Sequence, residues 1–258
     1  MEVIFMVRTI FKSFLISLQL LTRIPVPMLN VSDDSNNEKC FGLSVLFYPL
    51  VGLIIGAILV FVNKLLSYLS LPAHGLIEAS IILTVWILIT GALHLDGLAD
   101  SADAWLGGYG DKKRTLDIMK DPYCGPAGVV VLLLVLLMKF SAIIVIGWEI
   151  LLLAPVLGRT AAMLLLATTP YVRQGGMGEL AANRLSKNTV WFVTLLVVTL
   201  SIFWLEQSSL VVLLIFFVGY LLRLMMIKRI DGTTGDTAGA MVELIELSVL
   251  VGFVVSHQ

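Results

Sequence analysis

The sequence predicts an all-α fold, a polytopic transmembrane helix bundle of about six to seven spans with an N-terminal interfacial amphipathic helix. Of the 258 residues, 59% are hydrophobic and 14% are charged, whereas soluble domains average about 45–50% and 25%. The mean hydropathy is +0.99. A globule of this length could not cover its surface with so few charges, so much of that surface must face lipid. An ordinary soluble enzyme, a disordered chain and a coiled coil are thereby excluded.

Apolar stretches of about 20 residues, the length of a bilayer span, recur along the chain. They cover Phe41–Val62, Leu76–Leu95, Gly128–Gly147, Ile150–Thr169, Val190–Leu205, Leu210–Ile227 and, less clearly, Ala238–Val255. The last stretch is the weakest because it contains two glutamates, which are costly at membrane depth. The stretch from Thr9 to Arg23 is short and polar on one side, which is typical of an interfacial helix and not of a signal peptide.

Glycine and proline positions predict local features of these spans. Gly52 and Gly56 form a small-xxx-small face, which favours close helix packing within one subunit or in a homo-oligomer. Pro49 is expected to kink the first span. Pro126 is expected to begin the helix of the third span, where a proline loses no hydrogen bond.

The distribution of Lys and Arg predicts the orientation of the bundle. With the N-terminus in the cytoplasm, the basic loops alternate consistently, and the opposite loops hold one lysine, Lys64. The cytoplasmic set is Arg8, Lys12, Arg23, Lys39, Lys112, Lys113, Arg114, Lys120, Arg173, Arg184, Lys187, Lys228 and Arg229. The formal net charge is −1, so no nucleic acid partner is expected. We therefore expect a single integral membrane domain, 1–258, in the cell (inner or plasma) membrane, with its C-terminus outside.

The first informative motif is the acidic run from His94 to Asp103, which follows the second span and opens a cytoplasmic loop covering about 96–127. On a continuous helix, Asp96, Asp100 and Asp103 fall within an arc of about 60°. A solvated helix face would interleave Lys or Arg, whereas apolar residues flank these aspartates. Three like charges on one stripe predict a bound cation, and oxygen ligands favour Mg²⁺. The alternative is an acidic helix face paired with the basic residues that follow.

The second motif, at about 231–246, returns acidic residues to the same membrane face. Asp236 and Glu243 are seven residues apart, so they lie nearly in register on a helix. Threonine hydroxyls and backbone N–H groups near a helix N-terminus suit a phosphate, and glycines such as Gly235 let a bulky ligand approach closely. We expect substrate binding by Asp231, Gly235, Asp236 and Glu243. The alternative is that the glycines serve turns and helix packing.

Charged residues elsewhere in the bundle extend the predicted site. Arg159 lies within a span, where an arginine is costly enough to indicate a function, and we expect it to bind substrate phosphates. Weaker candidates for the same role, each more typical of a topology anchor, are Arg173, Arg223 and Arg229. The alternative for Arg159 is an internal ion pair with Glu243 or Glu246, and Lys139 offers the same pairing. His94 is a predicted proton acceptor or hydrogen-bond donor beside the metal, and the alternative is an interfacial histidine.

Two carboxylate groups on one predicted membrane face indicate a single cation-bound polyphosphate site between helices. In such sites the cations hold the attacking and leaving oxygens of an in-line phosphoryl displacement. We expect Asp96, Asp100, Asp103 and Asp236 to be the Mg²⁺ ligands, and Asp96, Asp100 and His94 to be the catalytic residues.

Six runs carry a family resemblance: SFLISLQLLTRIPVP (13–27), FYPLVGLIIG (47–56), GALHLDGLADSADAWLGG (91–108), KKRTLDIMKDPYCGPAG (112–128), LGRTAAM (157–163) and DGTTGDTAGAMVE (231–243). In these runs the chain resembles the cobalamin synthase family, the adenosylcobinamide-GDP ribazoletransferases. The runs extend over nearly the whole chain in the right order, and together they are far more specific than a lone DxxxD pattern.

The resemblance implies a Mg²⁺-dependent integral membrane transferase in the final steps of vitamin B12 (cobalamin) biosynthesis. Such enzymes join adenosylcobinamide-GDP to α-ribazole, or to α-ribazole 5′-phosphate, and give adenosylcobalamin or its 5′-phosphate with release of GMP. The resemblance also implies that Asp96, Asp100 and Asp103 are metal ligands and that Asp236 and Glu243 form the second acidic contribution. The active site is expected to face the cytoplasm.

Two other functions stay open at this point. Another Mg²⁺-dependent membrane transferase, of the CDP-alcohol phosphotransferase or prenyltransferase type, would use similar chemistry. The run Asp96-Gly-Leu-Ala-Asp100, however, lacks the arginine of the DGxxAR motif of the phosphotransferases. An ion-coupled transporter would also carry intramembrane acids, but the acids here gather at one face and no internal repeat is evident.

Overall fold

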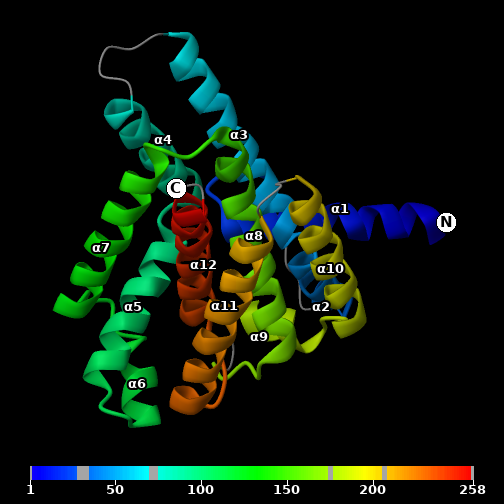
Figure 1. The fold of residues 1–258 in the computed structure, drawn as a ribbon. Helices are drawn as coiled ribbons and strands as arrows, with labels where there is room; N and C mark the ends of the chain where they lie inside the picture. The colour runs from blue at the N-terminus through cyan, green and yellow to red at the C-terminus, as the bar shows by residue number, and fades with distance from the viewer. Residues whose placement is uncertain (1, 28–34, 70–74, 174–176, 205–207, 257–258) are drawn as a thin grey trace.

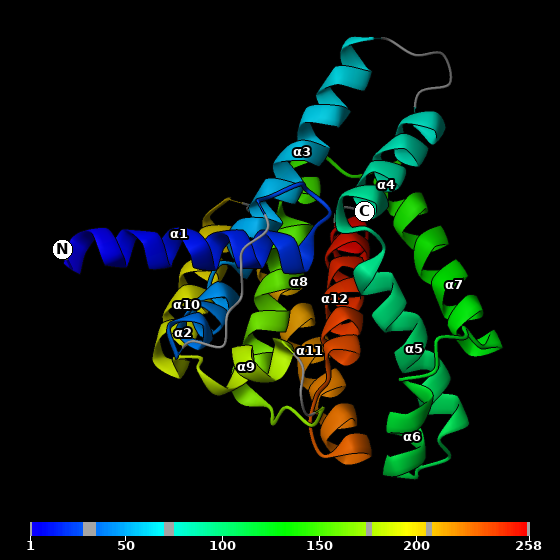
Figure 2. The same cartoon turned by 180° about the vertical axis from the view of Figure 1, so that it is seen from behind.

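A computed structural model describes residues 2–27, 35–69, 75–173, 177–204 and 208–256. The described residues form twelve α-helices, and their one bridge of β type joins Tyr171 to Thr233 (Figures 1 and 2). The helices are α1 (Glu2–Leu21), α2 (Ser35–Val45), α3 (Tyr48–Tyr68), α4 (Leu76–Thr90), α5 (Leu93–Gly107), α6 (Lys112–Ile118), α7 (Pro126–Ile143), α8 (Trp148–Thr168), α9 (Met177–Asn183), α10 (Lys187–Trp204), α11 (Ser208–Ile230) and α12 (Gly235–Ser256).

The predicted all-α membrane bundle is confirmed. Six helices, α3, α7, α8, α10, α11 and α12, are long and apolar enough to cross a membrane, and the bent pair α4 and α5 would make a seventh span. The doubtful last segment is therefore apolar enough to cross as α12, despite its two glutamates. Parts of two loops on the predicted non-cytoplasmic side, 70–74 and 205–207, lie outside the described residues.

The N-terminal helix α1 projects sideways from the bundle in both views (Figures 1 and 2). Its outer half exposes large apolar side chains, among them Phe5, Met6 and Phe11. Its inner half is buried against the bundle through residues such as Leu18 and Leu21. The helix begins earlier than the predicted stretch from Thr9 to Arg23, and a bilayer-surface position for it stays a prediction.

The second predicted span is wrong at its C-terminal end. The helix α4 stops at Thr90, and Gly91 and Ala92 take left-handed backbone conformations with φ of 60° and 56°. The chain turns by 86° there before α5 begins. A side chain at position 91 would clash with the Arg23 side chain. Position 91 therefore requires glycine, both for its positive φ and for lack of room. Arg23 is itself held at the bend, because its backbone N–H donates to Ile89 O at 2.7 Å. The bend carries the first acidic motif onto a helix of its own.

The helix α8 lies at the centre of the bundle and packs against α3, α10 and α12. The small-residue face of α3 is confirmed, because a Cβ at Gly52 or Gly56 would lie 2.5 Å from a backbone oxygen of α8. The predicted kink at Pro49 is wrong. A turn at 46–47 separates α2 from α3, so Pro49 falls in the first turn of α3, where it removes no helical hydrogen bond. Pro126 begins α7 as predicted.

The helix α12 brings the two acidic motifs together. It packs against α5, α7, α8 and α11. A Cβ at Gly97 of α5 would meet the backbone oxygen of Asp236 at 2.6 Å, and a Cβ at Gly239 of α12 would meet the His94 Cα at 3.3 Å. Two helices can approach this closely only where one of them carries glycine. Gly239, one of the glycines that the sequence marked for ligand approach, therefore serves a helix contact.

Candidate active site

The stripe of three aspartates predicted on one helix exists on α5. Asp96, Asp100 and Asp103 all lie between Leu93 and Gly107, and their flanking residues Leu95, Leu98 and Ala99 are buried. Asp96 is exposed and Asp100 is half-buried. The three like-charged neighbours that act electrostatically on Asp100 are Asp96, Asp236 and Asp103. The two acidic motifs thus form one cluster of carboxylates at one end of the bundle. This cluster of Asp96, Asp100, Asp103 and Asp236 is called the carboxylate group below.

Neither Asp96 nor Asp100 forms an ion pair within the part of the chain that the structure describes. The basic residues that follow them have other partners. Lys112 pairs with Asp231 at 2.6 Å, and Arg114 lies over the Tyr109 ring. The alternative of an acidic face neutralised by this loop is therefore not what the structure forms. Unpaired like charges at close range favour a cation from outside the chain.

Asp103 has a second role that the sequence did not reveal. Its two carboxylate oxygens accept hydrogen bonds from the backbone N–H groups of Gly125 at 2.7 Å and Gly128 at 3.0 Å, at the start of α7. A Cβ at either glycine would lie 2.5 Å from the Asp103 carboxylate. This contact satisfies two of the unpaired N–H groups of a helix N-terminus. Metal ligation by Asp103 stays a prediction, and it would use lone pairs that these bonds leave free.

Asp236 sits at the first turn of α12 beside a cation. Arg173, in the segment after α8, lies 3.1 Å from the Asp236 carboxylate. The segment is held in place by Val172 N–H donating to Thr233 O at 2.9 Å and by Thr233 N–H donating to Pro170 O at 2.8 Å. Burial and the Asp236 charge raise the pKa of Tyr171 above its usual range, so this phenol stays protonated.

A hydroxyl cluster fixes the loop that precedes α12. Thr233 and Thr237 share a hydrogen bond of 2.9 Å, and the Thr234 N–H donates to Thr237 Oγ1 at 2.8 Å. Asp231 stands apart in the exposed pair with Lys112, and Gly235 is exposed at the N-terminus of α12. The predicted substrate contacts of Asp231 and Gly235 stay predictions.

A pocket of about 270 Å³ opens beside Asp236, between α6, the segment after α8 and the start of α12. Its polar lining consists of Lys120, Arg173, Thr234 and Asp236. Two cations facing a carboxylate form an arrangement that suits a metal-bound phosphate, because the cations can hold non-bridging oxygens. The sequence indicated Lys120 only as a topology anchor, and Arg173 as a phosphate-binding candidate weaker than Arg159 and more typical of an anchor.

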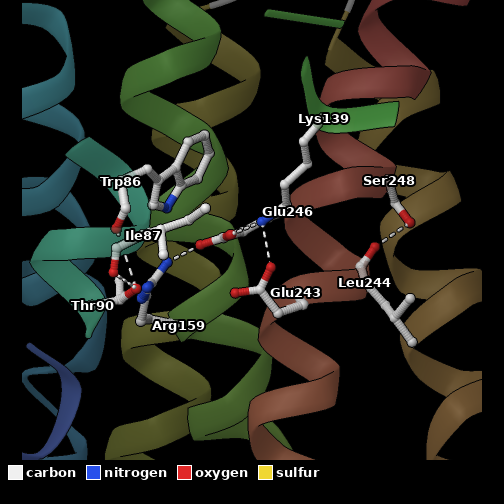
Figure 3. Close-up of polar contacts among 9 residues, drawn as sticks. All are labelled: Trp86, Ile87, Thr90, Lys139, Arg159, Glu243, Leu244, Glu246 and Ser248. Atoms are coloured by element: carbon white, nitrogen blue, oxygen red, sulfur yellow. Dashed lines mark hydrogen bonds and ion pairs between the residues drawn. The ribbon is translucent and has the colours of Figure 1, made fainter. Parts of the chain in front are cut away.

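Arg159 and Glu243 lie away from this pocket, inside the bundle (Figure 3). Lys139 of α7 lies 2.6 Å from Glu243 and 2.5 Å from Glu246, and Arg159 of α8 pairs with the other oxygen of Glu246. All four side chains are buried, with Arg159 and Glu246 at 0% exposure. The structure therefore forms the internal ion pairs that the sequence left open as the alternative, with two cations and two anions. Substrate binding by Arg159 and Glu243 stays a prediction.

His94 lies between the carboxylate group and the buried ion network. It is 4% exposed, and neither ring nitrogen has a hydrogen-bond partner in the described part of the chain. Arg159 and Lys139 act on it electrostatically, and Gly239 of α12 lies against its backbone. The interfacial alternative is wrong, because an interfacial histidine would contact water. A catalytic role stays a prediction.

The oxygens of the carboxylate group are the type of ligand that Mg²⁺ prefers. Among the described residues, no three His, Cys, Asp or Glu side chains are grouped so that they alone could hold a metal ion. Mg²⁺ does not need such a group, since proteins usually bind it through one or two carboxylates together with water and substrate phosphates. Asp96, Asp100 and Asp236 supply hard oxygen donors, and the pocket beside them provides cations for the phosphates.

Comparison with known proteins gives one consistent result. Residues 13–254 match the family model described as cobalamin-5-phosphate synthase. A relative from Pseudomonas entomophila (strain L48) is 50% identical over 93% of this chain and 97% of its own length. A relative from Acinetobacter baumannii (strain ACICU) is 45% identical over 95% of this chain and 97% of its own. A third, from Pseudomonas putida (strain GB-1), is 48% identical over 93% and 97%. Each of the three is named adenosylcobinamide-GDP ribazoletransferase. No solved structure matches the chain.

Proposed function

Because this chain belongs to the cobalamin-5-phosphate synthase family, we propose that it is the transferase that joins adenosylcobinamide-GDP to α-ribazole, or to α-ribazole 5′-phosphate, and releases GMP. The product is adenosylcobalamin or its 5′-phosphate, in the final steps of cobalamin biosynthesis. The observation that carries this proposal is the meeting of Asp96 and Asp100 with Asp236 beside a pocket lined by Lys120 and Arg173. An acidic group next to cations suits a diphosphate substrate.

The reaction is an in-line displacement at phosphorus. A ribazole hydroxyl oxygen attacks the phosphorus that carries the cobinamide arm, and the bond from that phosphorus to the bridging oxygen breaks. GMP leaves with the bridging oxygen, and the hydroxyl proton passes to a base. When bound, Mg²⁺ would neutralise the charge that develops on the diphosphate oxygens.

The chain's own residues hold and orient the diphosphate. Asp96, Asp100 and Asp236 would ligate Mg²⁺, and Asp103 would add to this set while it anchors α7. Arg173 has the geometry to bind two phosphate oxygens through its planar guanidinium group, and Lys120, which follows α6 in the chain, adds a second positive charge to the pocket lining.

His94 is the proposed proton acceptor. Its ring nitrogens have no partner among the described residues, so neither is held by a hydrogen bond. Its position two residues before Asp96 on α5 places its backbone at the carboxylate group. Closed helix packing around it would exclude water, which strengthens electrostatic contacts at such a site.

The site is proposed to face the cytoplasm from the cell inner membrane. Basic residues gather at the end of the bundle that holds the carboxylate group: Lys112, Lys113, Arg114, Lys120, Arg173, Lys228 and Arg229. The C-terminus lies at the opposite end of α12 (Figure 1). This asymmetry is the one that the positive-inside rule associates with the cytoplasm.

The test uses the full chain purified into lipid nanodiscs. With Mg²⁺, adenosylcobinamide-GDP and α-ribazole, we expect GMP and a corrinoid product to appear in equal amounts. Omission of α-ribazole or chelation of Mg²⁺ should abolish GMP release. Turnover of a lipid diphosphate or of a CDP-alcohol, without turnover of the corrinoid, would contradict the proposal and favour another transferase.

A further inference from the structure

A second pocket lies on the far side of α8 from the carboxylate group. It holds about 380 Å³ between α8, α10 and α11, with Met241 of α12 among its walls. Its lining is apolar over most of its area, with side chains such as Leu157, Leu164 and Ile215. Large apolar side chains at its rim, Trp191 and Phe216, are exposed. In a membrane-spanning bundle, this opening faces the acyl chains of the bilayer.

The pocket has one polar end. Arg223 of α11 lines it and is anchored to the end of α8, where its Nε donates to Thr169 Oγ1 at 3.0 Å and its Nη2 donates to the Thr168 backbone oxygen at 2.7 Å. Arg223 has no carboxylate partner in the described parts of the chain. The hydroxyl of Thr194, buried in the wall, also has no hydrogen-bond partner there. A cation at one end of an apolar cavity, together with a free donor in its wall, indicates an amphiphile with an anionic group.

The length of the pocket matches one leaflet of a bilayer. Along α11 the lining runs from Val212 to Arg223, which is about 16 Å at the helical rise. The hydrocarbon core of a bilayer is about 30 Å thick, so one leaflet accounts for about half of that. Arg223 lies toward the end of α11 that carries Lys228 and Arg229. Arg223 is about 7.5 Å along the helix from Lys228, within reach of the polar surface for a long side chain, and the apolar part extends from it across the middle of α11 to Val212.

We propose that this pocket binds one acyl chain of an anionic phospholipid, with the lipid phosphate on Arg223. The guanidinium group has N–H donors beyond the two that anchor it, and phosphate is a favoured acceptor for it. A bound lipid would fill the space between α10, α11 and α8, so it would act as part of the bundle. The proposal concerns a site separate from the carboxylate group and does not depend on the transferase reaction.

The experiment is native mass spectrometry of the full chain in a mild detergent, with phosphatidylglycerol or phosphatidylcholine of identical acyl chains added in turn. Gly219 lines the pocket, and a Cβ there would lie 3.7 Å from Ile245 and 4.0 Å from Met241, so Gly219→Leu would place a larger side chain in the pocket beside α12. Arg223→Gln removes the charge while keeping a side chain of similar length. Lys228→Gln, on the same helix but not in the pocket lining, is the matched control.

We expect the unaltered chain to retain phosphatidylglycerol about tenfold more strongly than phosphatidylcholine, because the choline cation of phosphatidylcholine offsets its phosphate charge beside Arg223. Arg223→Gln should lose this preference, Gly219→Leu should lose both lipids, and Lys228→Gln should keep both. Equal retention of the two lipids by the unaltered chain would overturn the proposal. Equal loss in Arg223→Gln and Lys228→Gln would also overturn it, since the effect would then be one of general charge. Binding of α-ribazole that Gly219→Leu abolishes would assign the pocket to a substrate and overturn it as well.

Discussion

Substitution of the buried Lys139 should destabilise the bundle far more than substitution of an exposed lysine whose ion pair has the same N–O distance. Lys139 contacts both Glu243 and Glu246, and it is buried together with them. In Lys139→Met the buried network would pass from two cations and two anions to one cation and two anions. Glu246 would keep Arg159, but Glu243 would have no cation. Leaving a buried charge unpaired costs about 3–5 kcal/mol.

The matched control is Lys112→Met. Lys112 lies 2.6 Å from Asp231, as close as Lys139 lies to Glu243, but both partners are exposed. Water screens such a pair, so its loss should cost less than about 1 kcal/mol. In thermal unfolding of the purified protein, we expect an apparent Tm lower by on the order of 10 °C for Lys139→Met and nearly unchanged for Lys112→Met.

A double variant tests the charge balance directly. Lys139→Met combined with Glu243→Gln restores one buried cation and one buried anion, the pair of Arg159 with Glu246. It should therefore recover most of the lost Tm. Equal Tm values for the two single lysine variants, or a double variant no more stable than Lys139→Met, would refute the reasoning. If the folded double variant shows a large rise in KM for adenosylcobinamide-GDP, Glu243 binds substrate as the sequence predicted.

Three further predictions concern the carboxylate group and its pocket. Asp96→Asn and Asp100→Asn should each lower the rate of GMP release at saturating Mg²⁺ by at least about a hundredfold with membrane insertion unchanged; a rate like that of the unaltered enzyme would remove the metal assignment. Arg173→Gln should raise KM for adenosylcobinamide-GDP about tenfold or more, and Arg173→Lys should fall between because it keeps the charge without the planar fork; an unchanged KM in steady-state assays would exclude the phosphate contact. Gly97→Val should abolish transfer by forcing α5 from α12, since a Cβ there would lie 2.6 Å from a backbone oxygen, whereas Gly219→Ala should keep activity because its Cβ would make only ordinary van der Waals contacts, at 3.7 and 4.0 Å; equal activities would show that the helix contact tolerates a side chain.

The membrane helices could be predicted from the sequence because lipid imposes a simple rule on composition. Apolar stretches of bilayer length end within a few residues of the observed helices in most cases, as at Ile150–Thr169 for α8. The three aspartates on one helix followed from their spacing alone. The bend at Gly91 and Ala92 could not be predicted from the sequence, because no local pattern indicates that an alanine takes a positive φ. The bend depends on packing around Arg23, which is distant in the chain.

The contacts of the site depend on pairs that are distant in the chain. Arg173 meets Asp236 across 63 residues, and Lys139 meets Glu246 across 107. Hydropathy and local spacing contain no information on such pairs. The three aspartates could be identified as a group from the sequence, since like charges on one stripe are unusual. Arg173 was only a weaker phosphate-binding candidate, equal to Arg223 and Arg229. Only the fold distinguishes the arginine at the pocket from the others.

The helix α12 connects the site to the interior of the bundle. Asp236 lies in its first turn, and Glu243 and Glu246 lie two to three turns further along. The two glutamates are fixed by Lys139 of α7 and Arg159 of α8, while Asp103 of α5 fixes the N-terminus of the same α7. The position of Asp236 relative to Asp96 and Asp100 is therefore set by contacts on two sides of α12. At this depth in a membrane, little water is available to solvate charged side chains, so ion pairs between helices stabilise them instead. The acids inside α12 are therefore compatible with a spanning helix, because each has a cation from a neighbouring helix.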